Sequence, residues 1–253
     1  MRKIGLFLAV IAAGVLANAY VQPAFAQANR TWVSGVGDDV NDCSRTTPCK
    51  TFAGAYSKTA TGGEINCLDP AGYGGLTITK SISIICDNVL AGVAVSGVDA
   101  FIVTVAATDK VILSGLNIQG AGAGLSGVKI TGSGKIFVIN SIISNFTRYG
   151  VEVVGTANAK VFIYNSQVTF NTLGGLLLQG QSGVTNFGII EGSMFDSNGA
   201  ASTVINAGGQ LFVSGSSLTG ATAAYSISGG TVTSYGDNVV RGSGTPTSTL
   251  PKS

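Results

Sequence analysis

Aromatic and basic side chains recur in this chain at a nearly fixed interval, and their chemistry suits the binding of sugar rings and acidic groups. Similar five-residue segments begin at residues 110, 135, 160, 185 and 210. The recurring residues are Phe137, Phe162, Phe187 and Phe212, with Tyr164 nearby, and Lys110, Lys135 and Lys160. Because side chains alternate along a strand, lysines that point outward place the phenylalanines outward as well. The sequence therefore predicts an aromatic row beside a lysine row, and exposed apolar patches usually mark binding sites.

The same residues also allow structural interpretations. If the lysines lie in the turns, the phenylalanines form an ordinary stack in the core. An outward row can also be covered by a long loop or by the C-terminal tail. Lysines on adjacent strands repel one another, although their flexible stems let them spread into water. A bound polyanion would relieve this repulsion, whereas a solvated edge would only tolerate it.

Residues for acid–base catalysis are few and scattered. Arg148 is the candidate general base, and Glu191 and Asp196 are the nearest carboxylates in the repeats, but they come from different coils. The chain has no histidine, so a Ser-His-Asp triad is excluded. No metal site is predicted, because the cysteines lack Cys-x-x-Cys spacing and there is no histidine to complete a zinc site.

The elements that position these residues are short strands in a repeating unit. A period of about 25 residues predicts a solenoid rather than a single globular core. Each unit holds three alternating apolar segments, so the coil has three sides, with coils about 4.8 Å apart. Asn145, Asn171 and Asn198 recur after the second segment and are predicted to form a ladder at one turn. Buried serines at the preceding corner are predicted at Ser141, Ser166 and Ser193, and Lys129 and Glu152 are predicted to stack as an opposite-charge pair.

The N-terminal segment has the features of an export signal. Residues 1–26 combine Arg2 and Lys3, an apolar run too short to span a bilayer and a small-residue cleavage site, so we predict a signal peptide and secretion. No other run predicts a transmembrane anchor. The chain has 14 basic and 12 acidic residues, and removal of Arg2 and Lys3 leaves 12 of each. A neutral chain is not expected to bind nucleic acid.

The mature N-terminus is predicted to form a cap over residues 27–75. All four cysteines lie there or just beyond, and an exported chain is expected to oxidise them. Of the three possible pairings we favour Cys43–Cys49 and Cys67–Cys86, because near neighbours close first. Residues 51–59 have the apolar spacing of a short helix, with Thr51 as its N-cap. Such a helix would cover the open end of the first coil.

The opening segments of the mature chain carry a family resemblance. They resemble those of secreted right-handed parallel β-helix proteins of the pectin-lyase-like superfamily, and the later repeats resemble that superfamily too. The matching segments are Trp32-Val33-Ser34, Gly37-Asp38-Asp39, Pro48-Cys49-Lys50-Thr51-Phe52, Gly62-Gly63-Glu64-Ile65 and Ile78-Thr79-Lys80-Ser81-Ile82. The resemblance implies an all-β, right-handed parallel β-helix. The strand pattern places it over residues 76–241, and the Pro/Thr/Ser-rich residues 242–253 are predicted to form a flexible tail.

Function follows less directly, because this scaffold hosts lyases, hydrolases and adhesins. We predict a secreted, non-catalytic protein that binds extracellular or envelope polysaccharide along the aromatic and lysine rows, without a cofactor. One alternative is a polysaccharide lyase or hydrolase: for a lyase the resemblance implies carboxylates that hold Ca²⁺ beside an Arg or Lys base, and for a hydrolase it implies a cluster of Asp residues. A third hypothesis is a structural rod or adhesin that associates with copies of itself.

Overall fold

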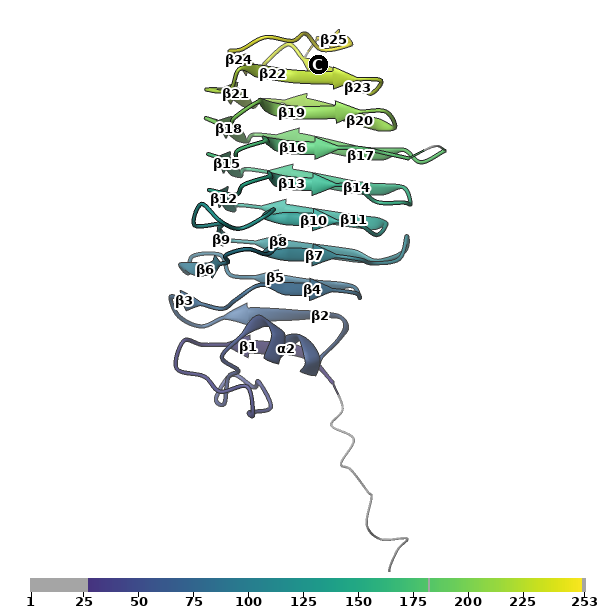
Figure 1. The fold of residues 1–253 in the computed structure, drawn as a ribbon. Coiled ribbons are helices and arrows are strands. Elements are labelled where there is room, and N and C mark those ends of the chain that lie inside the picture. The colour runs from purple at the N-terminus through teal and green to yellow at the C-terminus, as the bar shows by residue number, and fades with distance from the viewer. Residues whose placement is uncertain (1–26, 182, 252–253) are drawn as a thin grey trace, which may run out of the picture.

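The computed structural model describes residues 27–181 and 183–251 and shows a rod of stacked coils with three parallel sheets (Figure 1). Sheet A consists of β1 (Ala28–Val33), β2 (Thr59–Cys67), β5 (Ile82–Ile85), β8 (Lys110–Ser114), β11 (Gly134–Ile139), β14 (Ala159–Tyr164), β17 (Asn186–Glu191), β20 (Gly209–Ser214), β23 (Thr231–Tyr235) and β25 (Ser248–Leu250). Sheet B consists of β3 (Ala71–Gly72), β6 (Ala91–Ala94), β9 (Leu116–Gln119), β12 (Ile142–Ser144), β15 (Gln167–Thr169), β18 (Met194–Asp196), β21 (Ser217–Thr219) and β24 (Val239–Val240). Sheet C consists of β4 (Leu76–Ile78), β7 (Phe101–Val103), β10 (Val128–Ile130), β13 (Tyr149–Val153), β16 (Gly174–Leu178), β19 (Ala201–Asn206) and β22 (Ala223–Ser228).

Alternation along each strand separates the core from the surface. In β11 the side chains of Ile136 and Val138 are fully buried, while Lys135 is exposed and Phe137 is half-buried. Parallel pairing keeps equivalent residues above one another, so each coil adds one apolar layer to a continuous core. The three-sided, all-β coil predicted from the period is confirmed.

A ladder of buried serines holds the corner between sheets A and B. Each hydroxyl accepts a backbone N–H of the preceding coil over 3.1–3.2 Å and donates to the carbonyl two residues earlier in its own coil over 2.7–2.9 Å. The ladder comprises Ser141, Ser166, Ser193 and Ser216. Asn238 ends it, because its Oδ1 accepts the N–H of Ser216 at 2.8 Å. The buried corners thus keep their backbone groups paired within the protein.

The asparagine ladder differs from the prediction in one member. Asn171 and Asn198 are buried, and Oδ1 of Asn198 accepts both the backbone N–H and the Nδ2–H of Asn171, at 3.2 and 3.0 Å. Asn145 is wrong as a third member, because it is exposed with φ of 61° and donates to Gln119. The next residue, Phe146, occupies the buried position and donates its N–H to Oδ1 of Asn171 at 3.1 Å.

The N-terminal cap matches the prediction in its helix and its disulfides. Helix α2 (Phe52–Lys58) is capped by Thr51, whose hydroxyl accepts the Gly54 N–H at 3.0 Å. Phe52 is buried, and its ring lies 5.2 Å from that of Tyr73, so the helix covers the end of the core. The bonded pairs are Cys43–Cys49 and Cys67–Cys86. However, β1 and β2 already pair within sheet A, so the solenoid begins before residue 76.

The C-terminal segment differs from the predicted flexible tail. Residues 248–250 form β25, which pairs with β23, and Gly236 donates its N–H to the Leu250 carbonyl at 3.0 Å. Thr247 also accepts the N–H of Val232 through its hydroxyl. Although Pro, Thr and Ser are typical of loose tails, β-branched residues in this segment add a last short strand to an otherwise open edge.

Two predictions concern membranes and export. Within the residues that the structure describes, there is no helix of the length and apolarity needed to span a membrane. The predicted signal peptide, residues 1–26, lies outside the described residues.

Candidate functional site

The phenylalanine row lies on the outer surface of sheet A. Phe137, Phe162, Phe187 and Phe212 are half-buried, and their neighbours along the strands, such as Val138 and Ile163, are fully buried. Of the two orientations open from the sequence, the structure therefore has the outward one. We call the outer surface of sheet A from β8 to β23 the aromatic face.

The register within the aromatic face corrects the predicted row. Phe137 pairs with Phe162, but Phe162 then pairs with Ile189, and Ile189 pairs with Phe212. Phe187 pairs instead with Lys160 and so continues the lysine row. The coil from residue 160 to residue 187 is 27 residues long, and its two additional residues shift the repeat. An even shift keeps Phe187 on the outer side.

The rings still form one contiguous series across this offset. Phe137 and Phe162 are stacked, with centroids 4.6 Å apart and planes 10° apart. Phe187 lies 6.3 Å from Phe162 and 5.4 Å from Phe212, both in tilted arrangements. Tyr164 adds a further ring 6.2 Å from Phe162. These distances are typical of favourable aromatic pairs.

The lysine row is confirmed as a column in register. Lys135 pairs with Lys110 on one side and with Lys160 on the other, and all three side chains are exposed. Among the described residues none of the three forms a salt bridge, since those found join Arg30–Glu64, Lys129–Asp99 and Arg148–Glu152. Like charges directly opposite one another destabilise a sheet. The aromatic face thus holds three adjacent, uncompensated ammonium groups along one side.

The aromatic face is hollowed toward its C-terminal end. A groove of about 550 Å³ lies over β17, β20 and β23, and its lining includes Phe187, Phe212, Glu191 and Tyr235. A second hollow of about 550 Å³ adjoins it and also contains Glu191, with Tyr164. Sequence analysis missed the contributions of Ile189, Ser214 and Tyr235. Alternation from the neighbouring predicted residues would have placed Ile189 and Ser214 outward, whereas Tyr235 follows the last clear repeat.

The three catalytic candidates are not brought together. Glu191 lies at the end of β17 in sheet A, Asp196 ends β18 in sheet B, and Arg148 immediately precedes β13 in sheet C. Among the described residues no hydrogen bond or salt bridge joins any two of them. The hydroxyls of Thr219 and then Ser197 bond to the Asp196 carboxylate and lower its pKa. Asp196 is therefore a bonded, ionised acceptor.

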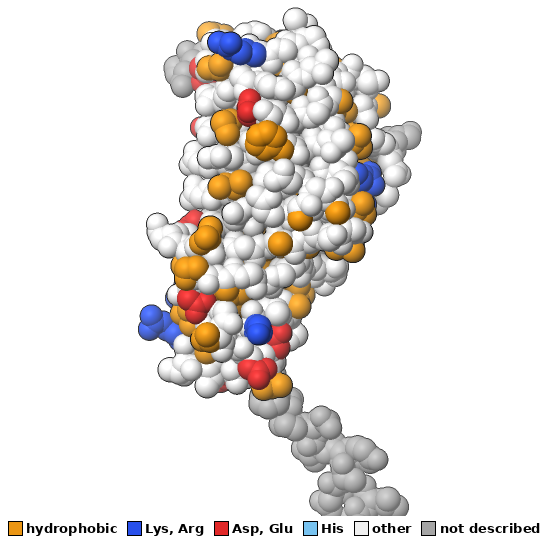
Figure 2. Space-filling model, turned by 60° about the vertical axis from the view of Figure 1, so that its left-hand side comes forward, with side chains coloured by type: hydrophobic (Ala, Val, Ile, Leu, Met, Phe, Trp, Pro, Cys, Tyr) orange, Lys and Arg blue, Asp and Glu red, His pale blue; other side chains and the backbone are white. Residues whose placement is uncertain are grey.

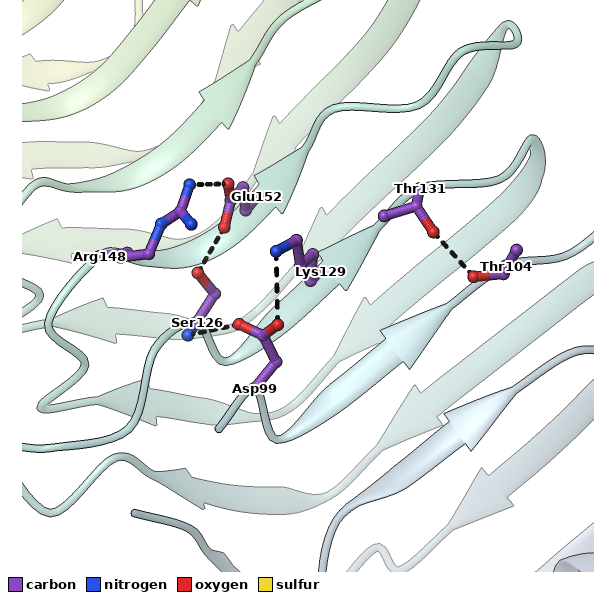
Figure 3. Close-up of polar contacts among 7 residues, drawn as sticks. All are labelled: Asp99, Thr104, Ser126, Lys129, Thr131, Arg148 and Glu152. Carbon is purple, nitrogen blue, oxygen red and sulfur yellow. Dashed lines mark hydrogen bonds and ion pairs between the residues drawn. The ribbon is translucent and has the colours of Figure 1, made fainter. Parts of the chain in front are cut away.

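Arg148 belongs to a polar network on sheet C (Figure 3). Its guanidinium contacts Oε1 of Glu152 at 2.5 Å, and the Ser126 hydroxyl donates to the other carboxylate oxygen at 2.6 Å. Glu152 has only 1% of its side chain exposed, so this ion pair holds a buried charge. A basic residue engaged in neutralising a buried carboxylate is poorly suited to act as a free base.

The charge pair predicted between Lys129 and Glu152 is wrong in its partners. The two residues are adjacent in register, but Nζ of Lys129 lies 3.5 Å from Oδ2 of Asp99 (Figure 3). Asp99 reaches Lys129 from the turn before β7, and it also accepts the Ser126 N–H at 2.9 Å. Glu152 is engaged by Arg148 and Ser126, so each charge has its own partner.

Sheet B offers no comparable surface. In the view of Figure 2 hydrophobic side chains are scattered over the molecule, and most charged ones gather near the N-terminal end. Ile142 and Met194 are 39% and 36% exposed, but Gln167 lies between them in register. Within the described residues there is no group of three or more His, Cys, Asp or Glu side chains that could hold a metal ion.

The fold defines a class before any relative is considered. Three parallel sheets, in-register turns and a continuous apolar interior are the features of a parallel β-solenoid. Comparison with protein families is consistent with this class: the model of the right-handed β-helix region matches residues 71–245. The chain belongs to this right-handed β-helix family.

Comparison with solved structures shows the same fold. The crystal structure of pectate lyase Pel9A is similar, with a TM-score of 0.57 and 18% sequence identity, over 90% of this chain and 77% of that one. Comparison with curated proteins finds no sequence match. The predicted right-handed parallel β-helix is confirmed, and the solved pectate lyase structure shares this fold.

Proposed function

We propose that this protein binds acidic polysaccharide along the aromatic face without cleaving it. One observation carries the proposal: a column of uncompensated lysines runs in register beside a series of half-buried aromatic rings. In β11 and β14 each coil presents one lysine and one phenylalanine two residues apart, namely Lys135 with Phe137 and Lys160 with Phe162. A polymer of acidic sugars offers a matching unit, because each ring has an apolar side and a carboxylate.

The spacing of the coils supports a ligand that lies along the rod. Adjacent strands of a sheet are about 4.8 Å apart, so the lysines and rings repeat along the long axis at that interval. Successive sugar units could then meet successive coils. Binding of carboxylates would also offset the repulsion among the ammonium groups, which no acidic side chain of the described residues relieves.

The proposal also covers where the protein is located and whether it needs a cofactor. The two disulfides are consistent with an exported protein, because disulfides persist in oxidising compartments. Contacts between lysines and carboxylates need no metal, so we expect retention of the polymer without Ca²⁺. The proposal involves neither nucleic acid nor a membrane anchor.

Affinity electrophoresis in gels containing a polyuronate or a neutral glucan tests the proposal. We expect the polyuronate to retard the wild-type protein, and the double variant Phe137→Ser/Phe162→Ser to bind about tenfold more weakly or worse. The matched control Ile142→Ser/Met194→Ser changes apolar side chains on sheet B and should bind like the wild type. A urea unfolding midpoint for each variant shows that the rod is intact.

The same samples separate the three functional hypotheses. Each polymer is incubated with protein, with and without Ca²⁺, and followed by ultraviolet absorbance for the unsaturated products of a lyase. Calcium-dependent products would refute the non-catalytic proposal. Light scattering without ligand reports self-association, and a folded rod that polymerises but retains no polyuronate would favour the structural hypothesis.

A further inference from the structure

One carboxylate on the aromatic face, that of Glu191, has no partner among the residues that the structure describes. Glu191 is exposed at the end of β17, and among the described residues its side chain forms neither a salt bridge nor a hydrogen bond. The nearest lysine in register, Lys160, pairs with Phe187, four residues from Glu191 along the strand. Four residues of strand span about 13 Å, which is too far for an ion pair.

This carboxylate lies where the two hollows of the aromatic face meet. Both hollows are lined by Glu191 and Ser214, and the larger apolar contributions come from Phe187, Phe212 and Tyr235 in one and Tyr164 in the other. Glu191 and Tyr164 are neighbours in register. Burial, and then the negative charge of Glu191, raise the pKa of Tyr164.

The sign of the charge changes along the aromatic face. Over β8, β11 and β14 its charged side chains are lysines, but over β17, β20 and β23 the groove contains Glu191. In the lysine row itself Phe187 and Gln210 replace the basic residue. An acidic sugar is therefore favoured at the N-terminal half of the face and disfavoured at the C-terminal half.

We infer that the groove over β17, β20 and β23 binds an amino sugar whose amine is protonated. The inference rests on the proposed function, because it assigns a specificity to one end of the same glycan-binding face. The apolar side of the pyranose ring would stack on Phe212 or Phe187, and the ammonium group would meet the Glu191 carboxylate. Tyr235 supplies a hydroxyl for the remaining polar groups of the sugar, and the Ser214 hydroxyl, which donates to Oδ2 of Asp237 at 3.0 Å, can accept a hydrogen bond from them.

The charge and the rings act together on such a ligand. Aromatic faces attract cations, and a free carboxylate beside them adds a charge-assisted hydrogen bond. An N-acetylated sugar keeps the ring but loses the charge, so it should bind only through stacking. A glycan with acidic units and free amino sugars could occupy both halves of the face at once.

Titration calorimetry with a glucosamine oligomer and with its fully N-acetylated counterpart tests the inference. We expect wild-type protein to bind the free-amine oligomer about tenfold more tightly or better, and Glu191→Gln to abolish that preference. The matched control Glu64→Gln removes a carboxylate from the same side of sheet A, far from the groove, and should keep the preference. Choline is added as a competitor, and displacement by choline at equal concentration would overturn the assignment to an amino sugar.

Polyuronate retention, measured on the same proteins, separates failure of this inference from failure of the proposed function. If polyuronate is retained and the glucosamine oligomer shows no dependence on Glu191, the inference alone is refuted. If the oligomer binds through Glu191 and polyuronate does not bind, the amino-sugar site stands and the acidic-polymer proposal fails. Absence of binding to both refutes both.

Discussion

The corrected asparagine ladder gives the sharpest test of the structure, through the substitution Asn198→Ala. Asn198 is 1% exposed and makes three hydrogen bonds through its side chain. Its Oδ1 accepts from the backbone N and from Nδ2 of Asn171, and its Nδ2 donates to the Val168 carbonyl at 2.8 Å. Alanine removes all three bonds and leaves two buried donors and one buried acceptor without their partner.

The magnitude follows from the groups left behind. A buried polar group without a partner costs about 1–3 kcal/mol, and such costs are not additive within one network. We expect Asn198→Ala to lower the free energy of unfolding by about 3–5 kcal/mol. For a chain of this length 1 kcal/mol corresponds to a shift in Tm of roughly 2–4 °C, so Tm should fall by about 10 °C.

Asn145→Gly is the matched control. Asn145 was predicted as a ladder member, but its side chain is exposed and its φ of 61° suits glycine. We expect this variant to change the free energy of unfolding by less than about 1 kcal/mol. Both variants are compared by circular dichroism in urea, with midpoint and slope recorded. Equal destabilisation by the two substitutions would refute the ladder described here.

Three further predictions address other parts of the rod. The Asp69 carboxylate accepts a hydrogen bond from the Gly35 N–H, and this bond is the largest cause of its lowered pKa. The ionised carboxylate therefore stabilises the fold above the unfolded pKa of about 3.9, and this stabilisation is lost as pH falls through the folded pKa. Asp69→Asn should flatten the fall in urea unfolding midpoint between pH 5 and pH 2, and an unchanged pH profile would contradict this. Truncation after Arg241 removes β25 and exposes the edge of β23, so light scattering should show association that increases with protein concentration. A strictly monomeric product would argue against the role of β25 in covering this edge. Arg148→Met should lower the free energy of unfolding in urea by about 1–3 kcal/mol, which is less than for a fully buried ion pair because Arg148 is 41% exposed. Adding Glu152→Gln should recover most of this loss. Absence of recovery would mean that the ion pair is not the cause.

The sequence was sufficient for the fold because the repeat is a local pattern. Alternation within β11 and β14 identifies which residues enter the core, and their spacing identifies one coil. The disulfides and helix α2 were equally accessible, since both depend on residues close together in the chain. Outward orientation of Phe137 followed from parity once Lys135 was taken as exposed.

The errors arose where a turn changed length or position. The coil that ends at β17 contains two additional residues, and sequence spacing alone does not show whether they lie before or after Phe187. Asn145 occupies the same left-handed turn position as Phe170 and Ser197, with φ of 61°, 57° and 52°. Asparagine suits both that exposed position and the buried one after it, so residue type did not distinguish them.

The sequence by itself determined the period, the three-sided coil and the cap, and it linked the side on which the phenylalanines lie to that of the lysines without deciding which side that is. Only the tertiary structure decided which rings are neighbours across coils, which partner each charge takes, and that Glu191 lies in an aromatic groove with Tyr235. The physical reason is that parity along a strand is set by the local backbone. Contacts across strands depend instead on register, and register changes with every residue gained or lost in a turn.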